Sequence, residues 1–363
     1  MTTAPPEARE PVTPDPAIEI RMTTLHATRG ANYWSRRPVM RMDLTVGAFE
    51  DISSADVDGF TDKLVAAMPG LEEHRCSIGE RGGFITRLHR GTYAPHIVEH
   101  VALELQTMVG HDVGYGRTRG GDNEGEYTLV FEHMHEAVGL RAAALALETV
   151  QQAFAGTLNG VEHAVAELNA LAQTPDVPTL QQHVLCGITG GSDRGATRDE
   201  IVRHGFGGDE LIVDVSPAYL LQAGLPYSRS DIAIVLDTTL TDVPERYQET
   251  ERAQRLVAIV ADAVDRGGIV IVPAKEWEVQ DRVREAACRV AIFATNADVT
   301  RRDKRVARAV ALVDRDRILL ESRGRTTELG VVRDDAPVAA QVAGALAVYT
   351  LQELQPQTPA LTT

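Results

Sequence analysis

The chain has 363 residues, of which 44% are hydrophobic and 24% charged, and its formal net charge is −16 at pH 7. The length predicts two or three domains, and the composition is that of a folded globular protein. Binding to phosphate-rich surfaces needs clustered Lys and Arg, so the acidic balance excludes nucleic acid and membranes as general partners. The three widely spaced cysteines exclude a disulfide framework and a CxxC-type zinc site, which fits a reducing compartment.

The two ends of the chain are predicted to be tails, at residues 1–17 and 356–363, because both are polar and contain proline. The first of them lacks the basic and apolar blocks of a signal peptide. No apolar run reaches the ~18 residues that cross a bilayer. We therefore expect a cytoplasmic protein.

Residues 18–160 are predicted to form an α+β domain. Alternating apolar and polar residues indicate a strand at 40–46, and a second strand is predicted at 127–132. Apolar residues at helical spacing indicate three helices, at 56–68, 95–110 and 136–155. The stretch 74–91 is rich in glycine and charge, which predicts a loop near a site or a turn between strands.

Residues 161–182 are predicted to be a linker that Pro175 and Pro178 punctuate, and residues 183–355 a second domain. Four β-branched runs in the second domain predict buried strands, at 211–215, 232–236, 269–273 and 290–294. Helical stretches alternate with them, notably at 244–264. This alternation is typical of an α/β domain with a mostly parallel, helix-covered sheet.

His96-Ile-Val-Glu99-His100 has the order of the inverted zinc metallohydrolase motif. Residues four apart lie on one helix face, so both imidazoles can bind one divalent metal ion, for which zinc is the first choice. Glu99 flanks the same ion and can take a proton from a metal-bound water, whose pKa falls to about 7. The motif therefore predicts a metal site with Glu99 as the catalytic base, and the alternative is a solvated helix with a chance pattern.

A catalytic zinc usually has three protein ligands, so the motif leaves one to be found. Glu132, Glu80 and His74 are the candidates, and Glu132 at the end of a strand is favoured. Glu104 lies two helical turns beyond His96, about 12 Å at roughly 1.5 Å per residue. We expect Glu104 to orient His100 rather than to bind the ion.

Five side chains are candidates for binding a substrate: Glu80, Arg81, Arg117, Arg29 and Trp34. Aromatic and guanidinium groups bind peptides well, and an arginine holds a carboxylate through two parallel hydrogen bonds. The alternatives are packing for Trp34 and surface ion pairs for the arginines.

Several motifs between residues 29 and 118 resemble, in order, the amino-terminal domain of cyanophycin synthetases. They are Arg29-Gly-Ala-Asn-Tyr-Trp-Ser35, Leu71-Glu-Glu-His-Arg-Cys-Ser77, Gly79-Glu-Arg-Gly-Gly-Phe84, His96-Ile-Val-Glu-His-Val-Ala-Leu-Glu-Leu-Gln106 and Asp112-Val-Gly-Tyr-Gly-Arg-Thr118. That family polymerises aspartate and arginine into a branched peptide, using an ATP-grasp domain and a Mur-ligase-like domain. The resemblance implies that this domain holds the polymer and, as in some members, carries a metallopeptidase-like site.

The second half of the chain is similar in layout to the Mur-ligase-like part of that family, over residues 214–225 and 230–236. There is no room for an ATP-grasp domain. The glycine-rich stretch 187–197 lacks the lysine of a phosphate-binding loop, and residues 238–242 replace the family's Asp-His pair. We therefore expect a reduced Mur-ligase-like domain, and no ATP-dependent ligation by this chain.

These features favour a metal-dependent hydrolase that cleaves an amide or isopeptide bond in a cyanophycin-like peptide with aspartyl and basic groups. The alternative is a non-catalytic substrate-binding or scaffold protein that partners a separate ligase. In either case we expect a homo-oligomer.

Overall fold

The computed structural model describes residues 14–35, 37–177, 182–206 and 211–354. The tail expected at 356–363 and most of that expected at 1–17 lie outside this part of the chain. Of the first tail, the described residues include the start of a short helix, α1 (Pro16–Glu19), whose N-terminus the Asp15 side chain caps. Among the described residues, none of the helices has the length and apolar character that crossing a membrane requires.

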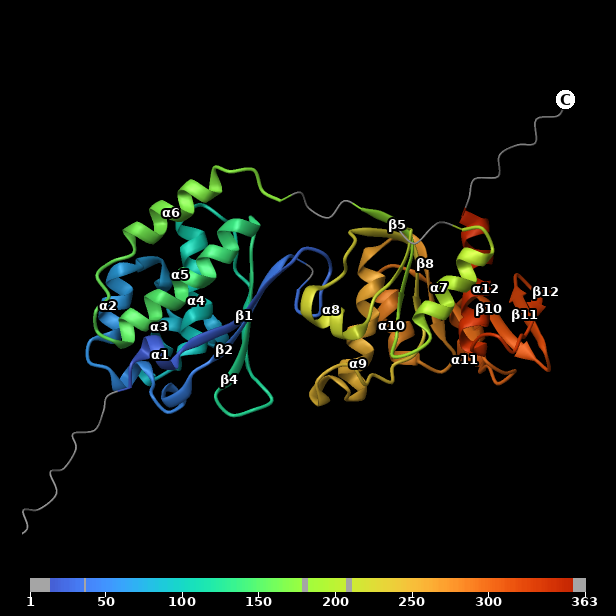
Figure 1. Ribbon diagram of the computed structural model, residues 1–363, viewed down its shortest axis with the longest axis horizontal. Helices are drawn as coiled ribbons and strands as arrows, with labels where there is room; N and C mark the ends of the chain where they lie inside the picture. Colours follow the sequence, from blue (N-terminus) through green and yellow to red (C-terminus); the bar gives the residue numbers. More distant parts are fainter. Residues whose placement is uncertain (1–13, 36, 178–181, 207–210, 355–363) are drawn as a thin grey trace, which may run out of the picture. The chain divides into compact units, whose positions relative to one another are not determined.

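The chain divides into two compact units, each with its own sheet and core. Unit 1 comprises Met1–Ala27 and Val39–Val177, and unit 2 comprises Thr28–Pro38 and Pro178–Thr363 (Figure 1). The short segment 28–38 is therefore close in sequence to unit 1 but packs with unit 2.

Unit 1 contains a four-stranded sheet in the order β1-β2-β4-β3. Its strands are β1 (Arg21–Thr28), β2 (Val39–Thr45), β3 (Gly116–Gly120) and β4 (Glu126–Glu132). The central strand β4 runs antiparallel to β2 on one side and to β3 on the other. Leu129 of β4 lies opposite Met42 of β2 and opposite Thr118 of β3. The two predicted strands, β2 and β4, are thus confirmed within one residue.

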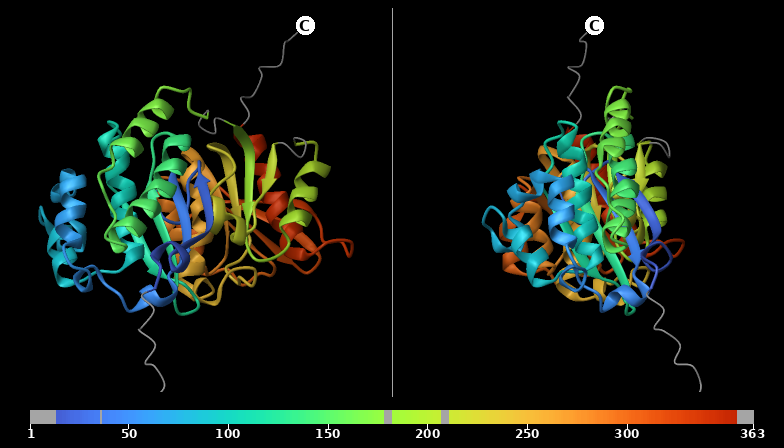
Figure 2. Two further views of the ribbon diagram at one scale, coloured as in Figure 1. Left: turned by 60° about the vertical axis from the view of Figure 1, so that its left-hand side comes forward. Right: turned by 90° about the vertical axis from the view of Figure 1, so that its left-hand side faces the viewer.

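The helices of unit 1 pack against this sheet or against one another (Figures 1 and 2). They are α2 (Phe60–Ala67), α3 (Gly83–Arg90), α4 (Ala94–Met108), α5 (Glu136–Phe154) and α6 (Glu162–Ala172). Four short 3-10 turns join them: Gly47–Glu50, Ser54–Asp56, Pro69–Glu73 and Cys76–Ile78. The core is the apolar side of α4 and α5 against the sheet, with Val98, Val101 and Phe131 fully buried. The three predicted helices are present, although the first is shorter than predicted.

Two expectations for unit 1 are wrong. The stretch 74–91 is not only a loop, because α3 begins at Gly83, with Phe84 and Leu88 buried on one face. The expected linker 161–182 contains α6, whose Ala164 and Leu168 pack into the core of unit 1. α3 is short and has few apolar residues, so its periodicity is weak. α6 was included in the linker because Pro175 and Pro178 follow it closely.

Unit 2 contains an eight-stranded sheet in the order β12-β11-β10-β9-β8-β7-β5-β6. The strands are β5 (His183–Thr189), β6 (Ile212–Asp214), β7 (Arg229–Val235), β8 (Val264–Pro273), β9 (Arg289–Ala294), β10 (Ala307–Asp314), β11 (Arg317–Ser322) and β12 (Arg325–Val331). The pairs from β6 to β10 are parallel, and the last two pairs are antiparallel. A mostly parallel sheet is therefore confirmed, and all four predicted strands belong to it.

Helices cover both faces of the unit 2 sheet, as a parallel sheet requires (Figure 1). They are α7 (Arg194–Arg203), α8 (Pro217–Ala223), α9 (Thr250–Val257), α10 (Trp277–Glu285), α11 (Arg301–Val306) and α12 (Val338–Leu354). Two 3-10 turns, Glu245–Tyr247 and Ala258–Ala263, interrupt the single helical stretch that was expected at 244–264. α7 and α12 pack together on one side, and α9 and α10 on the other.

Asp303 fastens the start of α11 to the sheet of unit 2. Its fully buried carboxylate accepts hydrogen bonds from the backbone N–H and Oγ1 of Thr300 (3.0 and 2.7 Å), from Gln280 Nε2 (2.9 Å) and from the Lys275 N–H (3.2 Å). Burial alone would raise the pKa of Asp303, but these hydrogen bonds outweigh it and the net pKa is lowered.

Replacing Asp303 with Ala is expected to destabilise unit 2 by about 2 kcal/mol, because it removes a cap and leaves buried donors unsatisfied. The folded-state pKa of Asp303 lies below its unfolded value, so its contribution is complete above about pH 5 and is lost as the pH falls through the folded pKa. Urea unfolding of the wild type and of Asp303→Ala at about pH 7 and about pH 3 measures both effects. An equal difference in the free energy of unfolding at the two pH values would contradict this account.

Candidate functional site

The His-x-x-Glu-His motif lies on α4, which packs between the sheet and α5. Pro95 occupies the first turn of α4, where its missing N–H costs nothing. The motif faces a cavity of about 900 Å³ in unit 1. Side chains from α3, α4, β3 and the two 3-10 turns before α3 form its walls, and the polar ones are Glu73, His74, Arg75, Cys76, Ser77, Arg87, His96, Glu99, His100, Glu104, Thr107, Tyr115, Arg117 and Thr118.

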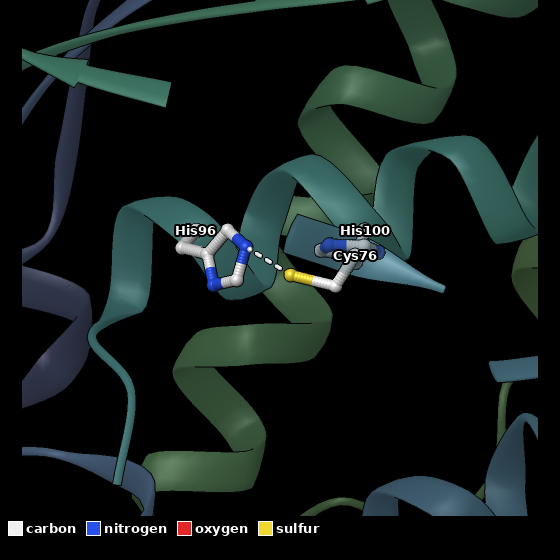
Figure 3. Close-up of side chains that lie close together, drawn as sticks. All are labelled: Cys76, His96 and His100. Atoms are coloured by element: carbon white, nitrogen blue, oxygen red, sulfur yellow. Dashed lines mark hydrogen bonds between the residues drawn. The ribbon is translucent and has the colours of Figure 1, made fainter. Parts of the chain in front are cut away.

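Cys76 contacts the first histidine of the motif in this cavity. Its Sγ lies 3.3 Å from His96 Nε2 (Figure 3). On the other side of this ring, Thr92 Oγ1 lies 2.9 Å from His96 Nδ1. Cys76 has a φ of 53°, a left-handed conformation that is unusual for a residue with a side chain. Such strained residues cluster at functional sites, because the surrounding fold must hold them in place.

A chain of polar contacts orients the second histidine. His74 Nδ1 lies 2.8 Å from His100 Nδ1, and Glu104 Oε2 lies 3.1 Å from His74 Nε2. Glu104 was expected to orient His100, and the structure gives it this position through His74 rather than by direct contact. A carboxylate at the end of such a chain fixes the tautomer and the ring orientation of a metal-binding histidine.

Burial sets the ionisation of the motif. It lowers the pKa of His96 to about 4, with the charge of Arg87 acting in the same direction. It also lowers the pKa of His100 to about 2, together with His96, His74 and Arg87. Both imidazoles are therefore neutral at pH 7, which is the form that binds metal ions.

Glu99 is buried against β3. Burial raises the pKa of Glu99 to about 7, although a 2.5 Å hydrogen bond from Thr118 Oγ1 and the charge of Arg87 oppose this. β3 approaches so closely here that a Cβ on Gly116 would lie 2.6 Å from Glu99 Oε1. The glycine in this strand therefore gives Glu99 its space.

Cys76, His96 and His100 form a set of donors that suits a zinc ion. Each offers one ligand atom, and these atoms lie within 4.8 Å of one another. A thiolate and two neutral imidazoles are ligands that zinc binds in proteins. The fit rests on this donor set and its spacing.

Glu132 was the favoured third ligand, and the structure contradicts this. Its Oε2 accepts from the backbone N–H groups of Gly114 (3.4 Å) and Tyr115 (3.3 Å), and it does not belong to the cavity wall. Glu132 therefore holds the loop before β3. Cys76 is half-buried in the cavity wall.

Some of the other candidate residues of unit 1 line the cavity, and the rest lie outside it. Arg117 lines the cavity from β3, and His74 lines it as well. Glu80 and Arg81 lie outside the cavity wall, on the exposed turn before α3. Arg81 forms a surface ion pair with Glu73, which is the alternative that was considered for it.

Arg29 and Trp34 belong to the segment 28–38, which packs with unit 2. Neither residue lines the cavity of unit 1. Trp34 is buried in an aromatic cluster with Tyr33 and Tyr247. Their expected role in binding a substrate stays a prediction.

The glycine-rich stretch of unit 2 forms the turn between β5 and α7, where a phosphate-binding loop would lie. The N–H groups of Gly191 and Ser192 donate instead to the carboxylate of Asp237, at 3.0 and 3.1 Å. Arg194 donates to the carbonyl of Gly190. A phosphate would have to displace Asp237 to use these donors, and the absence of a nucleotide site in this chain stays a prediction.

Comparison with known proteins assigns the amino-terminal unit. Residues 39–155 match the family model described as the cyanophycin synthase-like N-terminal domain. The resemblance that the motifs indicated is thereby confirmed for this domain.

The matching relatives are much longer than the shared domain. Cyanophycin synthetase of Crocosphaera subtropica is 50% identical over 123 residues, which cover 33% of this chain and 14% of that protein. Cyanophycin synthetase of Synechocystis sp. is 47% identical over 126 residues, with the same coverage of 33% and 14%. The likeness thus spans about a seventh of the relatives' length.

Solved structures of ligases match over about half of the chain, at low similarity. MurF ligase from Thermotoga maritima in complex with ADP has a TM-score of 0.34 and 10% identity, and the match covers 48% of this chain and 46% of that one. A pseudomurein peptide ligase type C from Methanothermus fervidus has a TM-score of 0.34 and 7% identity, with coverage of 54% and 53%.

The expectation of metal-dependent amide hydrolysis is wrong. The relatives that share the amino-terminal domain are synthetases, whose name describes the formation of a bond and not its cleavage. The names of these relatives therefore give no support to hydrolysis. They give no support to the scaffold alternative either.

Sequence reasoning missed the roles of Cys76, Arg87 and Thr118 at the site. Cys76 lies 20 residues before His96 and Thr118 lies 18 residues after His100. No helical or strand period links positions so far apart. The one available signal was chemical, because a cysteine thiolate is a ligand that zinc binds in proteins.

Proposed function

We propose that unit 1 binds a peptide with aspartyl and basic side chains and holds it for amide ligation, in the cavity of about 900 Å³ that the α4 motif faces. The observation that carries the proposal is the presence of both charges in this cavity, within a domain that matches the cyanophycin synthase-like model. Arg75, Arg87 and Arg117 offer cations to aspartyl carboxylates, and Glu73, which also pairs with Arg81, offers an anion to basic side chains.

The arginines of the cavity are available for a ligand. Within the described part of the chain, Arg117 forms no ion pair, and Arg87 donates to the Ser77 hydroxyl at 2.8 Å. An arginine binds a carboxylate through charge-assisted hydrogen bonds, which are about twice as strong as neutral ones.

We further propose that Cys76, His96 and His100 hold a divalent ion, with zinc favoured by the donor set. When bound, the ion supplies a Lewis acid that attracts a carboxylate or carbonyl oxygen of the peptide. His74 and Glu104 orient His100, and Thr92 orients His96. Glu99, hydrogen-bonded to Thr118, borders the same space.

Binding of a synthetic peptide with an aspartate backbone and arginine on its side chains tests the proposal. Fluorescence anisotropy of the labelled peptide is expected to show saturable binding to the full chain. Replacing Arg117 with Ala should weaken binding by about tenfold or more, since a hydrogen bond to a charged group contributes about 1.5–3 kcal/mol.

Arg90→Ala is the matched control, because Arg90 is an exposed arginine of unit 1 outside the cavity wall. It removes the same charge and should leave the affinity within about twofold of the wild type, as a rim or surface charge does. Equal losses in Arg117→Ala and Arg90→Ala, or no binding by the wild type, would overturn the proposal.

A further inference from the structure

The segment 28–38 packs closely against the rest of unit 2. The Leu225 N–H donates to the carbonyl of Ala31 at 2.8 Å. A Cβ on Gly30 would lie 2.3 Å from the carbonyl oxygen of Leu225, so a larger residue does not fit at this contact. The side chain of Asn32 accepts from the N–H groups of Trp34 and Ser35, at 2.9 Å each, and so fixes the turn.

Aromatic and cationic contacts continue this packing. The rings of Tyr33, Trp34 and Tyr247 meet edge to face, with centroids 5.1 to 6.3 Å apart. The guanidinium of Arg255 lies 4.8 Å over the Tyr33 ring, and its Nη2 donates to the Tyr33 carbonyl at 3.1 Å. Arg255 has five N–H donors, so this arrangement holds the group in place and leaves donors for a ligand.

A cavity of about 270 Å³ lies beside this segment, within unit 2. Trp34 and Arg255 line it on one side, and Arg282 and Glu285 of α10 on the other. This volume is just below the ~300 Å³ at which sites for drug-sized ligands begin, so it suits a ligand of a few heavy atoms.

Three of the side chains that line the cavity, Trp34, Arg282 and Glu285, have few polar partners among the described residues. Trp34 is 6% exposed, and its buried Nε1 has no hydrogen-bond partner among the described residues. Arg282 has a single ion-pair contact, 4.0 Å to Glu251, and Glu285 forms no ion pair within the part of the chain that the structure describes. Arg282 and Glu285 lie one helical turn apart on α10 and do not pair with each other, although this spacing permits it.

We propose that this cavity binds a free α-amino acid. Its carboxylate would face Arg255 and Arg282, and its ammonium group would face Glu285. An α-amino acid carries both charges on one carbon, which matches a cation and an anion that are presented side by side. The proposal does not depend on the peptide site of unit 1, since the two cavities share no residue.

Tryptophan fluorescence can report this binding directly. The chain has two tryptophans, so a Trp277→Phe variant leaves Trp34 as the single reporter in the cavity wall. Titration with L-aspartate, L-arginine and glycine is expected to change the Trp34 emission saturably, with matching heat in calorimetry of the wild-type chain. Succinate and putrescine carry one kind of charge each and should bind at least about tenfold more weakly, because each leaves one charged partner unpaired.

Variants of residues on α10 test whether the amino acid binds in this cavity. Arg282→Ala and Glu285→Gln should each weaken amino-acid binding by about tenfold or more. Arg284→Ala is the matched control, because Arg284 is an exposed arginine of the same helix outside the cavity wall. The proposal is overturned if none of the amino acids binds, if succinate binds as tightly as they do, or if Arg282→Ala and Arg284→Ala have the same affinity.

Discussion

The wild-type chain is expected to bind one zinc ion per molecule, and His100→Ala is expected to lose it. Three protein ligands define such a site, and His100 is the ligand held from both sides, by α4 itself and by the contact with His74. Loss of a ligand should cost more than the 10–100-fold in affinity that loss of an orienting partner costs. Metal analysis after dialysis, and a competitive chelator titration, measure both quantities.

Variants around the ion separate ligands from orienting residues. Cys76→Ala should behave as His100→Ala does, and Glu104→Gln should lower the zinc affinity by about 10–100-fold without abolishing binding. His89→Ala is the matched control, because His89 is an exposed histidine of α3 outside the cavity wall.

A second group of donors in unit 2 must be tested in parallel. His183, Asp231 and Asp265 also bring ligand atoms within 4.8 Å of one another, although Asp265 already pairs with Arg229 at 2.7 Å. If His183→Ala removed the zinc and His100→Ala retained it, the ion would belong to unit 2 and the site proposed for unit 1 would be wrong.

Arg333→Ala should lower the free energy of unfolding of unit 2 by about 2–3 kcal/mol. Glu200 of α7 is buried, and Arg333 binds its carboxylate through two hydrogen bonds of 2.6 and 3.3 Å. Removing one partner of a buried pair typically costs 3–5 kcal/mol, because a charge is left without compensation. Arg203 and His204 remain within 3.3 and 3.4 Å of Glu200, so the expected loss lies below that range.

Urea unfolding at pH 7 measures this loss, and Arg317→Ala provides the comparison. Arg317 pairs with Glu328 at 2.7 Å on the surface, with both side chains well exposed. A surface pair contributes about 0–1 kcal/mol, so Arg317→Ala should change stability by no more than that. A loss of similar size in both variants would show that the burial of Glu200 does not matter.

Much of the fold could be predicted from local patterns. Strands β2, β4, β7, β8 and β9 and helices α4 and α5 each bury a continuous apolar face, so their period is visible in the sequence. β1 was not predicted, because Arg21, Met22, Thr23 and Thr24 are exposed and show no alternation of burial. The antiparallel pair β11 and β12 was missed for a related reason, since β12 is exposed along most of its length.

The candidate site was only partly predictable. The spacing of His96, Glu99 and His100 places them on one turn of helix whatever the rest of the chain does. The third donor had to come from elsewhere, and nothing in the sequence distinguished Cys76 from Glu132. The glycines around Cys76 suggested a loop, whereas only the folded chain shows its Sγ at 3.3 Å from His96.

The sequence by itself determined three features: the family of the amino-terminal domain, the parallel sheet of the second unit and the two-histidine motif. Each of them depends on residues that lie close together along the chain. Tertiary structure alone decided which side chains meet. It turned Glu132 to the backbone of the loop before β3, set Asp237 against the glycine turn after β5, and placed segment 28–38 with unit 2. These three positions depend on contacts between residues that are far apart in sequence. Such contacts are determined by packing in the folded chain, and local periodicity does not predict them.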